Sequence, residues 1–302
     1  MNKAVIEEIK DKQFGKVVEN VSIKLLTTYK VGGRCDLVIY PKGVKELIDL
    51  RKYLKGKKIK YKILGNGSNV LFSDKHFNGV IIKLDNFKNM KIIDTKVSVG
   101  AGYSLVKLSY QTIKKNLRGL EFACGIPATV GGAIYMNAGA YKSDMGYIVK
   151  DCQVLTPDDK VITLTNKELD FHYRSSFFQK HPDYICLGAT LKLKRGNAKE
   201  LEQLVKDRKK RRMETQPLNF PSAGSVFRNP DGYFAGQLIE EVGLKGLQRG
   251  GAMISDKHAN FIVNYQNAKA RDIQDLIEIV YQSVLEKYNI ELKVEQEFVN
   301  WE

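Results

Sequence analysis

An arginine set between aromatic residues is the first candidate for chemistry in this chain. The segment HYRSSFF, residues 172–178, places Tyr173 and Arg174 among aromatic neighbours. The planar guanidinium of an arginine held in a cleft offers paired donors to a carboxylate or a phosphate. A surface arginine at the end of a strand gives the same pattern, so both interpretations stay open at this point.

A serine and two glutamates are further candidates. Ser225 lies in SAGSVFRNP, residues 222–230, next to Gly224. This segment does not resemble a GxSxG elbow, and no histidine is near in sequence to act as a base, so hydrogen bonding or proton donation fits Ser225 better than nucleophilic attack. Glu295 and Glu297 point to one face of a predicted strand. They are either site residues or charges on an edge strand.

A short loop of small residues indicates an anion-binding site. LGNGSN, residues 64–69, follows a strand-like stretch and alternates glycines with short polar residues. Backbone N–H groups freed by the glycines, together with the polar side chains, are the chemistry of an anion-binding nest. The residues expected to contribute are Gly65, Asn66, Gly67, Ser68 and Asn69.

A second segment, residues 126–141 (IPATVGGAIYMNAGAY), is crowded with glycine and alanine. Gly131, Gly132 and Gly139 can adopt positive φ angles and can let a ligand approach the main chain. A tight turn between buried strands would account for the same composition. Neither segment carries a Rossmann or P-loop fingerprint, since position 70 is a valine and no GxxxxGK[ST] occurs. The two segments together favour a diphosphate held without a Rossmann unit.

Helices and short strands alternate around these segments. Helical spacing of apolar residues predicts helices near 1–13, 44–54, 105–113, 198–212, 234–242 and 273–284, the last with Asn267 as a possible N-cap. Strand-like runs occupy 36–41, 60–64, 79–84, 96–102, 151–157, 160–164, 184–193, 260–265 and 291–299. Many short strands mixed with helices indicate an α+β fold and argue against a single open parallel sheet.

Composition is that of a globular protein. The chain has 302 residues, of which 43% are hydrophobic and 27% charged, enough for two or three domains. It has no apolar run of about 18 residues and no secretory signal pattern at its start, so we expect a cytoplasmic protein. The four cysteines lie far apart and the histidines are not clustered, which predicts reduced, mostly buried thiols and no metal site.

The net charge of +15 admits two interpretations. It is typical of a nucleic-acid or membrane-surface patch, or of a protein that binds an acidic small molecule. The lysines are spread along the whole chain, which weakens the patch interpretation. The densest run, RKKRR at residues 208–212, continues a helical pattern and is typical of a solvated helix face.

The order of the short motifs resembles that of a known family. YKVGG, LGNGSN, IPATVGG with NAGAY, HYRSSFF, GSVFRNP and SDKHANFIVN follow one another along the chain. Together they closely resemble the UDP-N-acetylenolpyruvoylglucosamine reductases, flavoenzymes of peptidoglycan precursor synthesis, over residues 27–295. Each motif is weak alone, but six in one order are highly specific.

The resemblance implies an α+β FAD-binding domain of the vanillyl-alcohol-oxidase (PCMH) type and a smaller α+β substrate-binding domain. We expect the first domain at residues 1–195, in two α+β subdomains at about 1–88 and 89–195, and the second at 196–302. The implied cofactors are non-covalent FAD and, as co-substrate, NADPH. Besides the five residues of the 64–69 loop, the implied FAD-binding residues are Ile126, Pro127, Ala128, Thr129, Gly131, Gly132, Asn137, Ala138 and Gly139.

The implied reaction reduces UDP-N-acetylglucosamine enolpyruvate to UDP-N-acetylmuramate. In the family, a hydride passes from flavin N5 to C3 of the enolpyruvyl group, and negative charge develops on C2 and its carboxylate. Arg174 matches the arginine that stabilises this charge. Ser225 matches the residue that gives a proton to C2, and Glu295 matches a residue that orients or polarises the carboxylate.

Glu295 is preferred over Glu297 because the spacing from Leu292 to Glu295 reproduces the family pattern. Gln296, where the family usually has valine, departs from that pattern and makes the register less certain. The implied substrate-binding residues are Tyr173, Arg228 and Asn229.

Thr215 stands where one subgroup of the family has lysine, so we expect Arg228 or the 208–212 run to supply the missing charge. The short C-terminal region indicates the loop-less type, which lacks an inserted loop that closes over the substrate.

The resemblance implies the substrate and NADPH as partners, with no nucleic acid, no membrane insertion and no obligate protein partner. One rival hypothesis is another FAD oxidoreductase of the same fold, such as an alcohol or sugar oxidase. Those enzymes often carry FAD attached to a histidine or cysteine, and Cys124 would be available. The other rival is a nucleic-acid-binding module, which the net charge would support.

Overall fold

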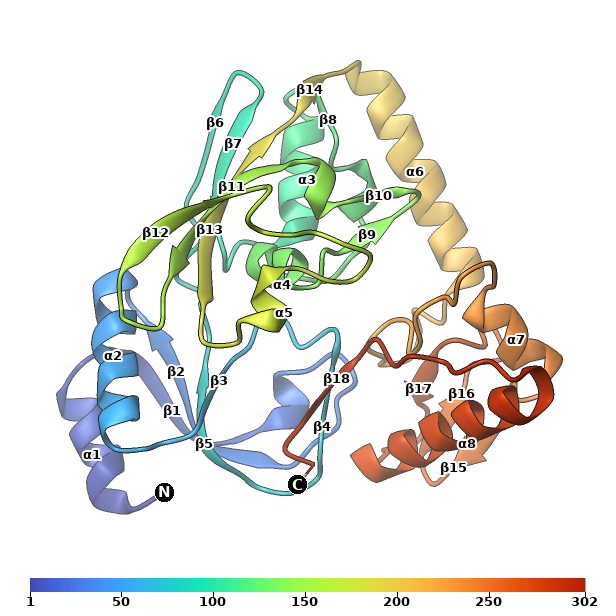
Figure 1. Cartoon of the computed structure of the whole chain (residues 1–302), viewed down its shortest axis with the longest axis horizontal. Helices are drawn as coiled ribbons and strands as arrows, with labels where there is room; N and C mark the ends of the chain where they lie inside the picture. Colours follow the sequence, from blue (N-terminus) through green and yellow to red (C-terminus); the bar gives the residue numbers. More distant parts are fainter. Residues whose placement is uncertain (302) are drawn as a thin grey trace. The chain divides into compact units, whose positions relative to one another are not determined.

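A computed structural model describes residues 1–301 and divides the chain into two compact units, each built from separated stretches of sequence (Figure 1). Unit 1 comprises residues 1–19, 37–66 and 78–210. Unit 2 comprises residues 20–36, 67–77 and the chain from residue 211 onward. Both mix helices and strands, so the predicted α+β class is confirmed.

The first part of unit 1 is built on a four-stranded sheet of order β1-β2-β5-β3, in which β3 and β5 are parallel. Its elements are α1 (Lys3–Asp11), β1 (Gly15–Ser22), β2 (Arg34–Pro41), α2 (Val44–Gly56), β3 (Tyr61–Ile63) and β5 (Phe77–Ile82). The amphipathic helix α2 buries Leu47, Leu50 and Leu54 in a core shared with β2 and β5. Burial of this apolar surface is the main term that stabilises the layer.

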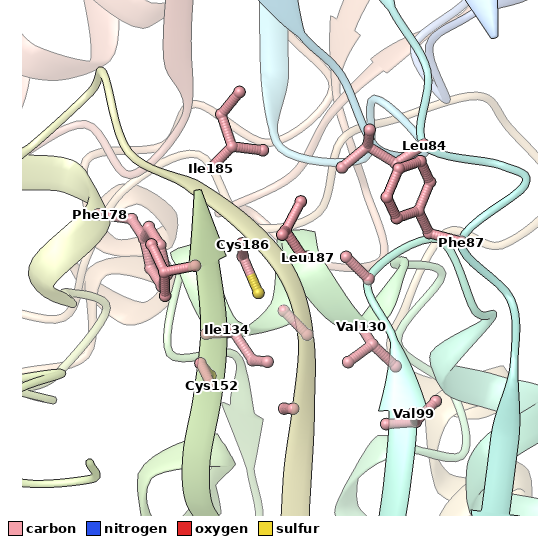
Figure 2. Close-up of a cluster of buried hydrophobic side chains, with 14 of the residues drawn as sticks. Leu84, Phe87, Val99, Val130, Ile134, Cys152, Phe178, Ile185, Cys186 and Leu187 are labelled. Carbon is pink, nitrogen blue, oxygen red and sulfur yellow. The ribbon is translucent and has the colours of Figure 1, made fainter. Parts of the chain in front are cut away.

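The second part of unit 1 is an antiparallel five-stranded sheet of order β12-β11-β13-β7-β6. Its strands are β6 (Met90–Ile93), β7 (Lys96–Gly100), β11 (Val149–Leu155), β12 (Val161–Thr165) and β13 (Ile185–Lys192). The helices of this part are α3 (Leu105–Ile113), α4 (Val130–Tyr135) and α5 (Phe177–Lys180), together with α6 (Ala198–Thr215) up to residue 210, where unit 1 ends. Figure 2 shows Val130 and Ile134 of α4 close to Leu187 of β13 and Val99 of β7, so α4 packs on this sheet.

Four very short strands form two further pairs in unit 1. They are β8 (Leu117–Arg118) with β14 (Lys194–Arg195), and β9 (Gly139–Ala140) with β10 (Ser143–Asp144). Three single turns of 3₁₀ helix complete the described elements of the chain: η1 (Ile23–Leu25), η2 (Glu121–Ala123) and η3 (Met145–Tyr147).

Unit 2 holds an antiparallel three-stranded sheet, two helices and a parallel strand pair. Its elements are β4 (Val70–Phe72), α7 (Ala235–Glu241), β15 (Gln248–Arg249), β16 (Ala252–Ile254), β17 (Ile262–Asn264), α8 (Ala270–Tyr288) and β18 (Glu297–Val299). The stripe predicted on α8 is buried in the core of unit 2: Ile273, Leu276, Ile277, Val280 and Val284.

Two predicted details of unit 2 are wrong. The last strand is limited to Glu297–Val299, because the chain bends at Gln296 and leaves Glu291–Gln296 outside any strand. Asn267 is not the N-cap of α8, which begins at Ala270 after Lys269. There the Asp272 carboxylate accepts the Lys269 backbone N–H at 2.9 Å, and the Asp74 carboxylate accepts the N–H groups of Ala270 and Arg271 at 3.0 and 3.2 Å, so the helix is capped by two aspartates.

The basic run lies on a solvated helix, as predicted. Helix α6 buries only Leu201 and Val205, whereas Lys209, Lys210 and Arg211 are exposed. All four cysteines are free and three are buried, which confirms the predicted state of the thiols. Across residues 1–301 we find no helix with the length and apolar character needed to cross a bilayer.

Candidate functional site

The loop at 64–69 contacts the start of the 126–141 segment, as the pairing of the two motifs predicted. The side-chain amide of Asn66 donates to the carbonyl of Pro127 at 3.1 Å. A Cβ on Gly65 would lie only 2.7 Å from Thr129 Oγ1, so glycine is needed for this close approach. Residues 65 and 66 of the loop and the start of the 126–141 segment therefore lie together in unit 1.

The 64–69 loop presents unused backbone donors. The N–H groups of Gly65, Asn66, Gly67 and Ser68 donate to no other described residue. Lys83, which is buried, donates from Nζ to the carbonyl of Gly65. Because C=O and N–H point in opposite directions across a trans peptide, this bond directs the Asn66 N–H away from Lys83. The loop thus has backbone donors without a partner among the described residues, as an anion-binding nest requires.

Lys83 also places a cation behind this loop. Desolvation lowers the pKa of its ammonium group, and the Asp85 carboxylate at 3.6 Å opposes that effect. Sequence reasoning did not select Lys83. The available signal was a single lysine directly after the apolar strand β5, a position where an unpaired charge would be costly.

The 126–141 segment contains helix α4, which the sequence analysis did not predict. Thr129 caps it by accepting the Gly132 N–H at 3.2 Å. Gly131, Gly132 and Gly139 all lie outside the left-handed region, so none of them uses the positive φ angle that glycine allows. The reason is that two of them are helical and Gly139 is in a strand.

Small residues in this segment make room for the protein's own chain. A Cβ on Gly131 would lie 2.9 Å from the Cβ of Ala101, and one on Gly139 would lie 2.5 Å from the carbonyl oxygen of Ser143. Ala128 and Ala133 are buried in the core of unit 1. The small residues of this segment are therefore needed largely because other parts of the same chain pack against them.

Asn137 joins this segment to the turn at residues 172–175, which contains Arg174. Its side chain is buried, donates to the His172 carbonyl at 2.8 Å and accepts the Gly146 N–H at 2.9 Å. Ala138 follows, with its N–H bonded to the carbonyl of Ala133 at 2.8 Å. Asn137 therefore holds the main chain at His172 and Gly146, and its contact with a cofactor stays a prediction.

Arg174 is held in an unusual backbone conformation against the same segment. Its φ angle is 53°, which is uncommon for a residue other than glycine. Its guanidinium donates to the Gly139 carbonyl at 2.9 Å and lies 5.0 Å from the centre of the half-exposed Tyr173 ring. Gln179 donates to the Arg174 carbonyl at 3.1 Å. Such an observed outlier, fixed by its neighbours, motivates a functional hypothesis.

In unit 2 the structure brings Ser225, Glu295 and Asn69 together through the main chain. The Glu295 N–H donates to the Val226 carbonyl at 2.8 Å, directly after Ser225. The Asn69 side-chain amide donates to the Glu295 carbonyl at 3.1 Å. Gly224 has a φ of 76°, which gives the turn that presents Ser225.

Glu295 and Glu297 do not share one strand, so the predicted common face is wrong. Glu297 pairs with Val70 in β4, and its backbone N–H donates to the Asn69 carbonyl at 3.0 Å. The bend at Gln296 separates it from Glu295, which lies beside the Ser225 turn. This difference in location supports the choice of Glu295.

The buried side chain of Gln296 was missed by sequence reasoning. It donates to the carbonyls of Ala223 and Ser225 at 3.3 and 3.4 Å, and it accepts from the Tyr29 hydroxyl at 3.1 Å. A glutamine between two glutamates is typical of a surface position, and the only signal was its departure from the family's usual valine. Gln296 anchors the turn that carries Ser225.

The remaining predicted residues lie in unit 2. The Arg228 N–H donates to the Lys293 carbonyl at 2.9 Å, and the Asn229 side chain accepts the N–H of Ala235 at 3.1 Å, at the start of α7. Thr215 is the last residue of α6. A hollow of about 540 Å³ in the same unit is lined in part by Gln216 and Lys257, and by none of the predicted site residues.

Comparison with known proteins covers nearly the whole chain. Residues 35–165 match an FAD binding domain, and residues 216–299 match the C-terminal domain of UDP-N-acetylenolpyruvoylglucosamine reductase. A relative of that name from Anoxybacillus flavithermus is 47% identical over 298 residues, 97% of each chain. One from Bacillus subtilis is 43% identical over 296 residues, 98% of each chain.

Solved structures agree with the sequence matches. The crystal structure of UDP-N-acetylenolpyruvylglucosamine reductase from Thermus caldophilus superposes with a TM-score of 0.81 at 36% identity. The match covers 94% of this chain and 99% of that one. The motif order, the FAD-binding fold and these full-length relatives agree, and the chain belongs to the UDP-N-acetylenolpyruvoylglucosamine reductase family.

Proposed function

We propose that this protein reduces UDP-N-acetylglucosamine enolpyruvate to UDP-N-acetylmuramate with NADPH, through FAD, as a step of peptidoglycan precursor synthesis. The observation that carries the proposal is the similarity to reductases of this name over 97% of the chain at 47% identity. Two contacts support it: Asn66 bonds the carbonyl of Pro127, and Glu295 bonds the carbonyl of Val226, next to Ser225.

The residues of the 64–69 loop fit a diphosphate such as that of FAD. The loop has backbone N–H donors that bond no other described residue, and the buried Lys83 donates to its Gly65 carbonyl. We propose that this loop and the residues named above between 126 and 139 hold FAD without a covalent bond. When bound, FAD supplies hydride transfer from NADPH to the substrate. Acid precipitation should release the flavin into solution; flavin retained on the protein pellet would contradict non-covalent binding.

Arg174 is proposed to bind the substrate carboxylate. Negative charge grows there as the enolpyruvyl double bond is reduced, and a guanidinium already fixed in place stabilises it without reorganisation. Removing one such donor typically costs about 3 kcal/mol of transition-state stabilisation. Glu295 is proposed to orient or polarise the same carboxylate.

Ser225 is proposed to give the proton to C2. A serine hydroxyl is a weak acid in water, but the enolate-like carbon that receives the proton is strongly basic, so a positioned hydroxyl suffices. The anchored turn around Ser225, held by Gln296 and by the Val226 carbonyl, provides that positioning.

Tyr173, Arg228 and Asn229 are proposed to bind the rest of the substrate. Replacing Arg228 with alanine should raise the KM for the substrate, because a cation for the diphosphate is lost. An unchanged KM would reject this role. The loop-less type, the domain boundaries at residues 195 and 196, and a cytoplasmic location also stay predictions.

The deciding experiment follows flavin absorbance in the two half-reactions. NADPH should bleach the oxidised flavin, and UDP-N-acetylglucosamine enolpyruvate should restore it; a substrate that does not accelerate reoxidation would overturn the assignment. A Ser225→Ala variant should keep NADPH-driven flavin reduction and lose substrate reduction by about 100-fold or more. Ser222→Ala, in the same segment, is the matched control. Equal loss of both half-reactions in Ser225→Ala would contradict proton donation.

A further inference from the structure

We propose that Arg208 of helix α6 is a positioning residue for Arg174, acting through the β9–β10 hairpin. The inference rests on the proposed function, because it assigns Arg208 to the step in which Arg174 binds the substrate carboxylate. All the residues that carry it belong to unit 1.

Arg208 differs from its neighbours in the basic run. Its guanidinium carbon lies 4.5 Å from the centre of the Tyr141 ring, within cation–π range, and the Tyr141 hydroxyl donates to the Arg208 carbonyl at 3.3 Å. Arg208 is half-buried, whereas Lys209 and Lys210 are exposed. The same residue thus holds Tyr141 at the ring face and at the hydroxyl.

Tyr141 lies in a turn that is unfavourable for its sequence. Ala140 pairs with Ser143, so Tyr141 and Lys142 form a two-residue hairpin turn, with φ angles of 54° and 59°. Turns with two positive φ angles favour glycine, asparagine or aspartate. Tyrosine and lysine in this conformation persist only when the surrounding structure holds them. The Arg208 guanidinium on the Tyr141 ring is such a restraint, and it is lost in Arg208→Ala, whereas the main-chain carbonyl of residue 208 still accepts from the Tyr141 hydroxyl.

The hairpin in turn holds Arg174. Its first residue, Gly139, pairs with Asp144, and its carbonyl accepts the hydrogen bond from the Arg174 guanidinium at 2.9 Å. A change at the turn, two residues away, would move that carbonyl. These contacts therefore link Arg208 to Arg174 through the hairpin residues Tyr141 and Gly139.

The alternative is that Arg208 acts on the substrate directly, as a cation for the diphosphate. The two roles give different kinetics. Loss of a diphosphate contact raises the KM, whereas misplacement of Arg174 lowers the rate of substrate reduction at saturating substrate. Small displacements of a reacting group are sufficient for a large loss of rate.

The first test compares Arg208→Ala with Lys206→Ala, which removes an exposed charge from the same helix. Both variants keep a good helix former on the surface, and flavin absorbance with thermal unfolding checks their folding. In Arg208→Ala, reoxidation of the reduced flavin at saturating substrate should slow about 5- to 10-fold, with NADPH-driven reduction within about twofold of wild type. Lys206→Ala should match wild type. A raised KM with an unchanged maximal rate would overturn the proposal.

The second test asks whether removing the backbone strain at Lys142 restores the rate of substrate reduction. Glycine adopts the conformation of Lys142 without steric cost, so Lys142→Gly in the Arg208→Ala background should recover most of the lost rate. No recovery would overturn the positioning role.

The third test measures coupling. In an Arg174→Ala background, Arg208→Ala should add little further loss, because residues that act through one another are not additive; a full additional loss would also overturn the proposal. Failure of the proposed function is a distinct result, since wild-type enzyme would then show no substrate-dependent reoxidation.

Discussion

The chemistry proposed for Ser225 depends on a residue that local sequence patterns did not reveal. Sequence reasoning selected Ser225 because small residues surround it, but what fixes its turn is Gln296, 71 residues away. Three consecutive polar residues, Glu295 to Glu297, give no alternation of polar and apolar types that would mark the middle one as buried. Only the fold shows that the Gln296 side chain has three partners, including the Tyr29 hydroxyl.

Replacing Gln296 with leucine should therefore destabilise the protein and slow the reaction. The leucine would leave the Tyr29 hydroxyl and the Ala223 carbonyl buried without this partner, and it would remove one partner of the half-buried Ser225 carbonyl. Buried unsatisfied groups typically cost about 1–3 kcal/mol each, so for the two buried groups we expect a loss of about 2–6 kcal/mol in the free energy of unfolding. Urea denaturation measures this loss, and reoxidation of reduced flavin by substrate measures the effect on Ser225.

Tyr29→Phe is the matched control for Gln296→Leu. It removes one hydroxyl and leaves both carbonyl contacts of Gln296 in place, so it should cost about 1 kcal/mol with little change in rate. If Gln296→Leu were as stable and as active as wild type, the anchoring role of Gln296 would be wrong.

At the scale of elements, helices and strands with clear periodicity were predictable, and the glycine-rich segment was not. Helix α8 and strand β13 follow directly from the spacing of their apolar residues. Helix α4 was not predicted because its two glycines are poor helix formers. What makes them necessary is contact with a distant element, since the Gly131 N–H donates to the Ala101 carbonyl at 2.8 Å. The sequence indicated that something lies close to the main chain of this segment, but it did not indicate that the neighbour is Ala101.

Adding one methyl group to α4 tests this explanation. In Gly131→Ala, the new Cβ would lie 2.9 Å from the Cβ of Ala101, closer than side-chain atoms approach, so α4 or its neighbour must move. Overpacking of this kind typically costs about 1–3 kcal/mol. We expect a lower melting temperature and weaker FAD retention, measured by thermal unfolding and by flavin release on dilution.

The control is the same substitution at a glycine that has space around it. Gly56, the last residue of α2, has no neighbouring atom within 4 Å of the position that a Cβ would take, and it lacks a left-handed φ. Gly56→Ala should therefore leave stability unchanged or raise it by up to about 1 kcal/mol. Equal destabilisation by the two substitutions would show that packing against Ala101 is not the cause.

At the scale of the whole molecule, the composition of the two units could not be inferred from local patterns. Residues 20–36 and 67–77 belong to unit 2 although most of that unit comes from the chain after residue 210. Examples are the β4–β18 pair and the Asn264 side chain, which donates to the Tyr29 carbonyl at 3.0 Å. Such pairings join residues more than 200 positions apart, and one sequence holds no signal for them.

Unit 2 should lose stability at mildly acidic pH because of His258. Desolvation lowers the pKa of this half-buried imidazole, and the positive charge of Lys245 acts in the same direction while Glu240 opposes it. His258 Nδ1 accepts the Asn260 N–H at 3.2 Å, a bond that needs the unprotonated nitrogen. In the unfolded chain a histidine takes up its proton near pH 6.5. Between that pH and the lower folded pKa the unfolded state binds more protons, so stability falls as pH falls.

The measurement is urea unfolding of wild type and His258→Asn from about pH 8 to about pH 5, a range in which histidine titrates. The asparagine side-chain oxygen can accept the same N–H and does not titrate. The other three histidines are present in both proteins, so their contributions cancel in the difference. The stability of wild type relative to the variant should decrease steadily below about pH 6.5. A difference that stays constant over this range would show that protonation of His258 is not linked to folding.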